Sequence, residues 1–203
     1  MAVISRRIMV PIVGKTELAH ERAKKLAAIM TKAGAGVRVL KVIFGEDAGN
    51  IEIFARFADF TEGTRASVAI QSDPDFKALM VEREKNTAAI ASGPYVYRLV
   101  FGEVSVQPVL LQREYQIDRK NLKHALDLLP EVKSANDPNS GLSAAVPTFS
   151  AEMDRLIITY YANSIDHMGE NIDKYGLSQP FKDVVMKASE YGKLVSARAL
   201  AVI

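Results

Sequence analysis

The chain has 203 residues, a net charge of +2 and no cysteine, with 48% apolar and 25% charged residues. This is an ordinary globular composition. The lack of cysteine excludes disulfides, thiolate metal sites and cysteine nucleophiles. The small net charge, with no long basic run, does not indicate nucleic-acid binding. No stretch approaches the roughly 20 apolar residues of a membrane span, and residues 1–15 do not resemble a signal peptide. We therefore expect a cytoplasmic protein without a membrane partner.

The first half of the chain predicts strands where residues alternate or are β-branched, and helices where apolar residues follow a period of 3.6. Thr16 is expected to cap a helix, and Ser72 to lie at or near the N-cap of another, with Pro74 in its first turn. Gly93-Pro94 is expected to end the last helix. The expected elements are a strand over 7–13, a helix over 17–33, strands over 37–44 and 51–60, a short helix over 61–70, a helix over 75–89 and a strand over 95–101.

The strand at 51–60 (IEIFARFADF) is the centre of this half. A strand places alternate residues on opposite faces. One set is apolar and should pack on helices, whereas the other is mixed and contains Glu52, Phe54 and Arg56. Because exposed faces rarely carry so much aromatic area, we expect a second layer, most simply another sheet, to cover the mixed face.

The second half repeats the same order of elements. Leu18 and Leu122 lie 104 apart (122 − 18), as do Ala58 and Ala162 (162 − 58). We therefore predict two ferredoxin-like β-α-β-β-α-β units in an α+β fold, with domains over 1–104 and 105–203. The expected elements are strands over 109–117, 142–149, 156–162 and 194–202, a helix over 121–129 disturbed by Pro130, a loop over 136–141, and helices beginning at Ser164 and Ser178.

This order, the strand ending in Asp59-Phe60 and the helix start over 72–76 (SDPDF) resemble the dimeric α+β-barrel superfamily, particularly its antibiotic-biosynthesis-monooxygenase and NIPSNAP-like branches. The resemblance implies two sheets packed face to face around a lumen. The two units could pair within one chain, or each could pair with a second chain as a homodimer. Members of the superfamily include cofactor-free monooxygenases, haem proteins and proteins of unknown function, and the fold does not choose between them.

A candidate ligand site follows from the mixed strand face. If that face lines the lumen, Arg56 could hold an anionic substrate; alternatively, Glu52 and Arg56 form an ion pair with each other or with the other unit. Arg98, on the last strand of the first unit, is expected to face the same cavity. The offset of 104 makes Tyr160 the counterpart of Arg56, which would leave the second unit less charged.

The three histidines predict no metal or haem site. His20 and His124 are expected on helix flanks, and His167 on a solvated helix face. Haem is implied by some members of the superfamily but is disfavoured, because no histidine falls on a strand or on the lumen side. We therefore predict no cofactor.

Two functions remain open, and the sequence does not establish whether the chain is an enzyme. The first is a small-molecule-binding or cofactor-independent monooxygenase-like barrel, which an apolar cavity with few polar groups would support and a filled lumen would contradict. The second is a non-enzymatic assembly or ligand-carrier module. A haem-dependent activity is third.

Overall fold

Eight antiparallel strands form one closed barrel in the computed structural model, which describes all residues 1–203. Around the barrel the strand order is β1-β3-β2-β8-β5-β7-β6-β4. Closure leaves no strand edge unpaired. The strands are β1 (Val3–Pro11), β2 (Gly36–Gly45), β3 (Ile51–Phe57), β4 (Ala89–Gly102), β5 (Val109–Ile117), β6 (Leu142–Phe149), β7 (Arg155–Ala162) and β8 (Gly192–Val202).

The barrel consists of two ferredoxin-like units. The first contributes β4-β1-β3-β2 and the second β8-β5-β7-β6, and the pairs β2–β8 and β4–β6 join them. The barrel therefore closes within one chain. The boundary expected between residues 104 and 105 falls in the connector between β4 and β5; that each unit is a domain of its own stays a prediction.

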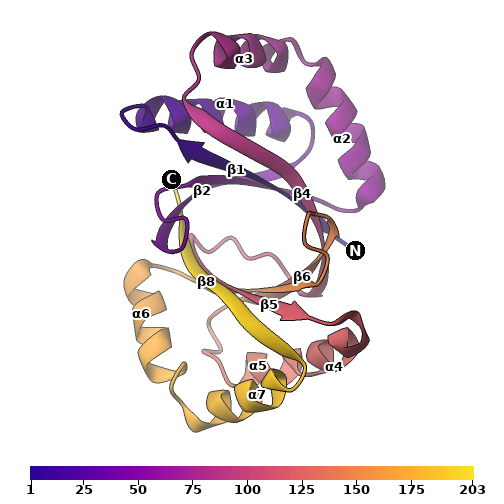
Figure 1. Ribbon diagram of the computed structural model, residues 1–203, viewed down its shortest axis with the longest axis vertical. Coiled ribbons are helices and arrows are strands. Elements are labelled where there is room, and N and C mark those ends of the chain that lie inside the picture. Colours follow the sequence, from indigo (N-terminus) through magenta and orange to yellow (C-terminus); the bar gives the residue numbers. More distant parts are fainter.

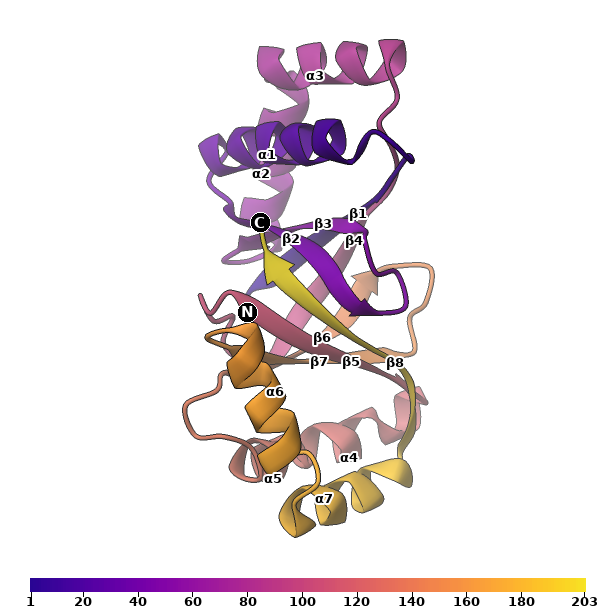
Figure 2. The same cartoon turned by 90° about the vertical axis from the view of Figure 1, so that its left-hand side faces the viewer.

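The helices cover opposite sides of the barrel. The helices of the first unit lie over one sheet, and those of the second unit lie over the other (Figures 1 and 2). None of them is long and apolar enough to cross a membrane. The helices are α1 (Thr16–Lys32), α2 (Phe60–Ser72), α3 (Pro74–Lys85), α4 (Leu122–Asp127), α5 (Leu129–Ser134), α6 (Ile165–Lys174) and α7 (Gln179–Ser189), with a 3-10 turn at Arg119–Asn121.

Each unit has its own apolar core between sheet and helices. On β3, the predicted apolar set packs against α1, α2 and α3, which confirms the face assignment of that strand. On β7, Leu156 and Ile158 occupy the same place in the second core. Glu52, Phe54 and Arg56 are thus left on the opposite face, toward the second sheet. The apolar set of β3 is Ile51, Ile53, Ala55 and Phe57.

Gly93-Pro94 does not end a helix. The helix expected over 75–89 stops at Lys85, and β4 begins at Ala89, so Gly93 lies inside a strand. Its φ of +91° favours glycine, and a Cβ there would lie 2.7 Å from the carbonyl oxygen of Arg6. The pairing of β4 with β1 shifts register at this point. The glycine therefore marks a bulge in a long strand.

Several helix starts differ from the expectation by one residue. Thr16 is the first residue of α1 and makes no capping hydrogen bond. Asp73, not Ser72, caps α3: its carboxylate accepts from the backbone N–H of Asp75 at 2.8 Å. The helix starts expected at Ser164 and Ser178 are confirmed, and each serine is the N-cap residue. Pro130 lies in the first turn of α5, where a proline is tolerated because that N–H has no helical partner.

Candidate functional site

The centre of the lumen is filled by an ion-pair network around Glu52. This carboxylate is fully buried and accepts hydrogen bonds from Arg6 Nε at 2.9 Å and Arg6 Nη2 at 2.7 Å. It also accepts from Arg198 Nη1 of the second unit at 2.7 Å. Two guanidinium groups thus share one carboxylate, and the network carries one excess positive charge.

The network continues across the second sheet. Arg198 Nη2 donates to Gln112 Oε1 at 2.9 Å, and Gln112 Nε2 donates to Thr159 Oγ1 at 3.2 Å. All of these residues are buried. They join β1 and β3 to β8, β5 and β7 through side chains, and they divide the lumen into two separate ends.

One end of the lumen, which we call the basic end, is a cavity of about 60 Å³. Four arginines and no acidic residue line it, because Arg38 and Arg56 join Arg6 and Arg198 of the network. The remaining wall is largely apolar. Its apolar residues include Ile4, Leu40, Phe54, Leu110 and Ile157.

Arg38 has no carboxylate partner. Its guanidinium donates to the backbone carbonyl oxygens of Ser105, at 2.9 Å, and Gln107, both in the connector between β4 and β5. Burial lowers the pKa of Arg38, against the opposing effect of the Tyr161 hydroxyl. Arginine still titrates far above neutral pH, so Arg38 is a charged, half-buried group without a counter-ion.

Tyr161 and Ser143 supply hydroxyl groups from the second unit. Their oxygens lie 2.8 Å apart, and both residues are buried. Burial raises the pKa of Tyr161, although the hydrogen bond with Ser143 and the charges of Arg38 and Arg56 act in the opposite direction. The phenol therefore stays protonated at neutral pH and can donate a hydrogen bond.

The opposite end, which we call the acidic end, is wider and has a different charge pattern. Its cavity measures about 420 Å³, and four acidic residues line it. Arg155 pairs there with Glu114 at 3.1 Å, with Glu152 at 2.9 Å and with Asp154. The positive charge at this end is thus neutralised by the protein itself. The four lining acids are Glu46, Asp47, Glu114 and Glu152.

The predicted site residues do not come together. Glu52 lies in the central network and pairs with Arg6 and Arg198, not with Arg56. Arg56 lines the basic end and is exposed. Arg98 lies on the outer face of β4, where its guanidinium stacks over Phe60 at 5.2 Å. The expectation that Arg98 faces the lumen is wrong, because its neighbour Tyr97 takes the lumen position.

Tyr160 also lies outside the lumen. It packs against the second core, whereas Ile157, Thr159 and Tyr161 line the basic end. The true counterpart of Arg56 is therefore Tyr161. A slip of one residue exchanges the two faces of a strand, and the offset of 104 contained such a slip.

Three arginines that line the lumen, Arg6, Arg38 and Arg198, were not predicted from the sequence. Arg38 on β2 and Arg198 on β8 were not identified as lumen residues, although each is the only arginine of its strand. Arg6 was left outside the first expected strand, which begins four residues earlier than predicted. In each of these strands a single arginine lies in an otherwise uncharged alternating set, and this was the available signal.

None of the three histidines reaches the lumen. His20 is half-buried on α1, and its Nε2 is buried without a hydrogen-bond partner. His124 stacks on Tyr191. His167 Nε2 lies 2.9 Å from Asp137 Oδ2, so this side chain is half-buried and not on a solvated face. The lumen residues do not fit haem, because a haem needs an axial ligand, most often histidine, and a far larger space.

The basic end can bind and polarise an anion but offers no general base. Its groups are guanidinium cations and hydroxyl donors, and no histidine or carboxylate lines the cavity. Guanidinium groups bind carboxylates and other planar anions through paired hydrogen bonds. A ligand here would need to be an anion before it binds.

Comparison with known proteins identifies the fold and not a family. No protein-family profile matches the sequence, and no curated protein matches it. Among solved structures, a proposed monooxygenase from Fusobacterium nucleatum subsp. nucleatum aligns with a TM-score of 0.66 and 9% identity over 99% of this chain and 92% of that one. A proposed monooxygenase from Lactobacillus acidophilus gives 0.65 and 10% over 100% and 94%.

An anthrone oxidase-like protein aligns with a TM-score of 0.63 and 11% identity over 100% of this chain and 91% of that one. At these identities the likeness concerns the arrangement of strands and helices and not the side chains. The chain adopts the dimeric α+β-barrel fold that these monooxygenase-like structures share, with both sheets supplied by a single polypeptide.

Proposed function

We propose that the chain binds a small organic anion at the basic end of its lumen. The observation that carries this proposal is the pair Arg38 and Arg56, two cations without carboxylate partners beside an apolar cavity. An apolar site with a few convergent polar groups is typical of small-molecule sites. The acidic end does not share this feature, because Arg155 is already neutralised.

The size of the cavity restricts the ligand. About 60 Å³ holds an anionic group with little more, so the rest of the ligand would extend past Arg56 toward solvent. The expectation is that a filled lumen would contradict a small-molecule-binding barrel; the central network fills only the middle of the lumen, and a small apolar cavity remains at the basic end. A small aromatic carboxylate or phenolate meets both conditions.

Calorimetric titration of the purified chain tests this proposal, with benzoate as the probe and benzamide as its uncharged counterpart. Benzoate should bind and benzamide should not. Arg56→Gln should weaken benzoate binding about tenfold or more, since a hydrogen bond to a charged group contributes about 1.5–3 kcal/mol. Arg98→Gln, which removes an exposed arginine from the outer face of the same sheet, is the matched control and should bind normally.

The proposal fails if benzoate and benzamide bind equally, or if Arg56→Gln and Arg98→Gln behave alike. Native mass spectrometry of the protein as purified complements the titration, because a retained ligand reports its mass directly. A clean apoprotein that still binds benzoate with the expected dependence on Arg56 would favour a carrier of exchangeable ligands.

Oxygenation of an electron-rich anion is a second candidate, favoured by the likeness to two proposed monooxygenases and an anthrone oxidase-like protein. Arg38 and Arg56 would stabilise the negative charge of a phenolate or enolate, and Tyr161 would donate to its oxygen. Because the cavity has no base, only a substrate that ionises in water would react. Oxygen uptake with anthrone, compared between the native chain and Arg56→Gln, tests this candidate. An absence of uptake would exclude oxygenation of anthrone and leave anion binding as the proposed function.

A further inference from the structure

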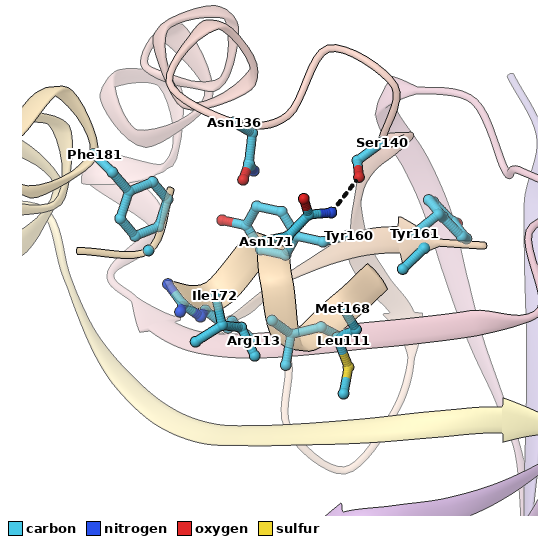
Figure 3. A pocket seen from close by; sticks show the side chains of 12 residues that line it. Leu111, Arg113, Asn136, Ser140, Tyr160, Tyr161, Met168, Asn171, Ile172 and Phe181 are labelled. Carbon is cyan, nitrogen blue, oxygen red and sulfur yellow. Dashed lines mark hydrogen bonds between the residues drawn. The ribbon is translucent and has the colours of Figure 1, made fainter. Parts of the chain in front are cut away.

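A second pocket lies outside the barrel, between the sheet and the helices of the second unit (Figure 3). Its volume is about 40 Å³. Strands β5 and β7 form its floor, α6 and α7 two of its walls, and the loop between α5 and β6 the remaining side. The residues that matter below are Arg113 of β5, Tyr160 of β7, Asn136 of the loop, and Ile172 and Phe181 of the helices.

Arg113 is the only charged residue that lines this pocket. Its guanidinium stacks on the rings of Phe181, at 5.2 Å, and Tyr160, at 5.7 Å. These contacts place the guanidinium beside two aromatic rings and supply no hydrogen-bond acceptor. None of its N–H groups has an acceptor in the protein, and its neighbour Glu114 points to the other face of β5, where it pairs with Arg155.

Two further donors surround the same space. Asn136 Nδ2 is buried and has no hydrogen-bond partner, which is rare in folded proteins. The hydroxyl of Tyr160 also lacks a partner, and burial raises its pKa, so the phenol stays protonated and donates. In Figure 3 the amide of Asn136 and the guanidinium of Arg113 lie on either side of the Tyr160 hydroxyl.

The nearby acidic residue cannot serve as the missing acceptor. Asp137 accepts from the backbone N–H of Asn139, from the Ser140 hydroxyl and from His167, and its side chain does not line the pocket. His167 Nδ1 itself accepts from the backbone N–H of Asn163, so Nε2 carries the proton that it donates to Asp137. This cluster is complete without the donors of the pocket.

The first unit contains an arginine at the equivalent position that has hydrogen-bond partners within the protein. Arg7 lies on the outer face of β1, as Arg113 does on β5, 106 residues apart (113 − 7). Arg7 donates to Ser5 Oγ at 3.1 Å and contacts Met30 Sδ at 3.9 Å. Arg113 has no comparable partner. The second unit therefore has an unfilled polar space beneath its helices at a position where the first unit has a hydrogen-bonded arginine.

We propose that this pocket binds the carboxylate of a small organic acid, with Arg113, Asn136 and Tyr160 as its three donors. A carboxylate supplies one negative charge and two acceptor oxygens, which complement one guanidinium and two neutral donors. Ile172 and Phe181 provide an apolar wall for a short carbon chain. The volume limits the ligand to one about the size of acetate. This site is independent of the lumen, because Arg113 faces away from it.

Nuclear magnetic resonance of the labelled full-length chain tests the site, with sodium acetate as the probe and acetamide as its uncharged counterpart. Acetate should cause saturable shifts of the Asn136 side-chain amide and the Arg113 Nε–H signals, and acetamide should not. Arg113→Gln should weaken acetate binding at least tenfold. Arg7→Gln is the matched control and should leave the affinity unchanged.

Tyr160→Phe keeps the ring that stacks on Arg113 and removes only the hydroxyl, so it keeps the test decisive if Arg113→Gln does not fold. We expect it to weaken acetate binding several-fold. The proposal is overturned if the shifts do not saturate, if acetamide reproduces them, or if they persist with equal affinity in Tyr160→Phe and Arg113→Gln. Arg56→Gln should have no effect here, which separates this site from the lumen.

Discussion

The two ends of the lumen contain similar numbers of cationic groups but neutralise them differently. At the acidic end, Arg155 is held by Glu114, Glu152 and Asp154. At the basic end, Arg38 has only backbone carbonyl oxygens as partners, and Arg56 has no ion-pair partner. Ion pairs at one end hold a loop in place, whereas free cations at the other end are available to a ligand. The difference shows that charge alone does not indicate a site; unpaired charge does.

The largest effect should come from the network that separates the two ends. Glu52→Gln removes the carboxylate and leaves Arg6 and Arg198 buried without a counter-ion. Breaking a buried ion pair on one side costs about 3–5 kcal/mol, so we expect a loss of that size in the free energy of unfolding, measured by urea denaturation.

Glu152→Gln is the control at the acidic end. It also removes a carboxylate from an arginine, but its side chain is 58% exposed, and Arg155 keeps two other partners. We expect a much smaller change in stability. Equal losses of stability in the two variants would show that the buried network around Glu52 contributes no more to stability than the exposed ion pair of Glu152.

A carboxylate introduced at the basic end should abolish its difference from the acidic end. Ile4 is the cross-strand partner of Arg56 and lines the same cavity, so Ile4→Glu places a negative charge beside that arginine. We expect benzoate affinity to fall about tenfold or more. Ile4→Gln has the same shape without the charge, and calorimetry should show a clearly smaller loss for it; equal losses would point to shape and not charge.

Removing one hydroxyl should have a smaller effect. Tyr161→Phe deletes the hydrogen bond with Ser143 and leaves the ring in place, which should cost about 1 kcal/mol of stability. Thermal unfolding measures this cost, and calorimetry with benzoate reports whether the hydroxyl also binds the ligand. Tyr160→Phe, one residue away on the opposite face of β7, should not change benzoate binding.

Acid should weaken the acidic end and not the basic end, which no carboxylate lines. The hydrogen bond from Gln116 and the charge of Arg155 lower the pKa of Asp154, against the opposing effect of desolvation. A lowered pKa stabilises the folded state above the unfolded value, near 3.9, and this contribution is lost as the pH falls through the folded value. Chemical shifts of the loop between β6 and β7 should therefore change below about pH 4, and Asp154→Asn should remove that transition; shifts at Arg38 should stay constant.

The fold was largely predictable, because it depends on patterns that a sequence displays. Strand β5 was predicted with its correct bounds, and the mixed face of β3 was correctly assigned, since its other set is purely apolar. On β7 both sets are apolar or aromatic, so no hydrophobic pattern chose between the faces. That ambiguity placed Tyr160 in the lumen instead of Tyr161.

The site was less predictable, because it depends on pairing across the barrel. Glu52 finds its second partner, Arg198, 146 positions further along the chain, and no local pattern indicates such a distance. Arg98 was misplaced for a different reason. Both alternating sets of the strand expected over 95–101 contain apolar or aromatic residues, so alternation did not show that Tyr97, and not Arg98, faces inward.

The pairing of β2 with β8 and of β4 with β6 has a consequence for how the protein behaves in dilute solution. A barrel built from two separate chains comes apart as its concentration falls, by mass action. Here the two halves are tethered, so each meets the other at a high effective concentration whatever the total amount of protein. The basic end takes Arg38 from one half of the chain and Tyr161 from the other. Because the halves are tethered, we expect this end to stay assembled, and its ligand affinity to stay the same, at low and at high protein concentration.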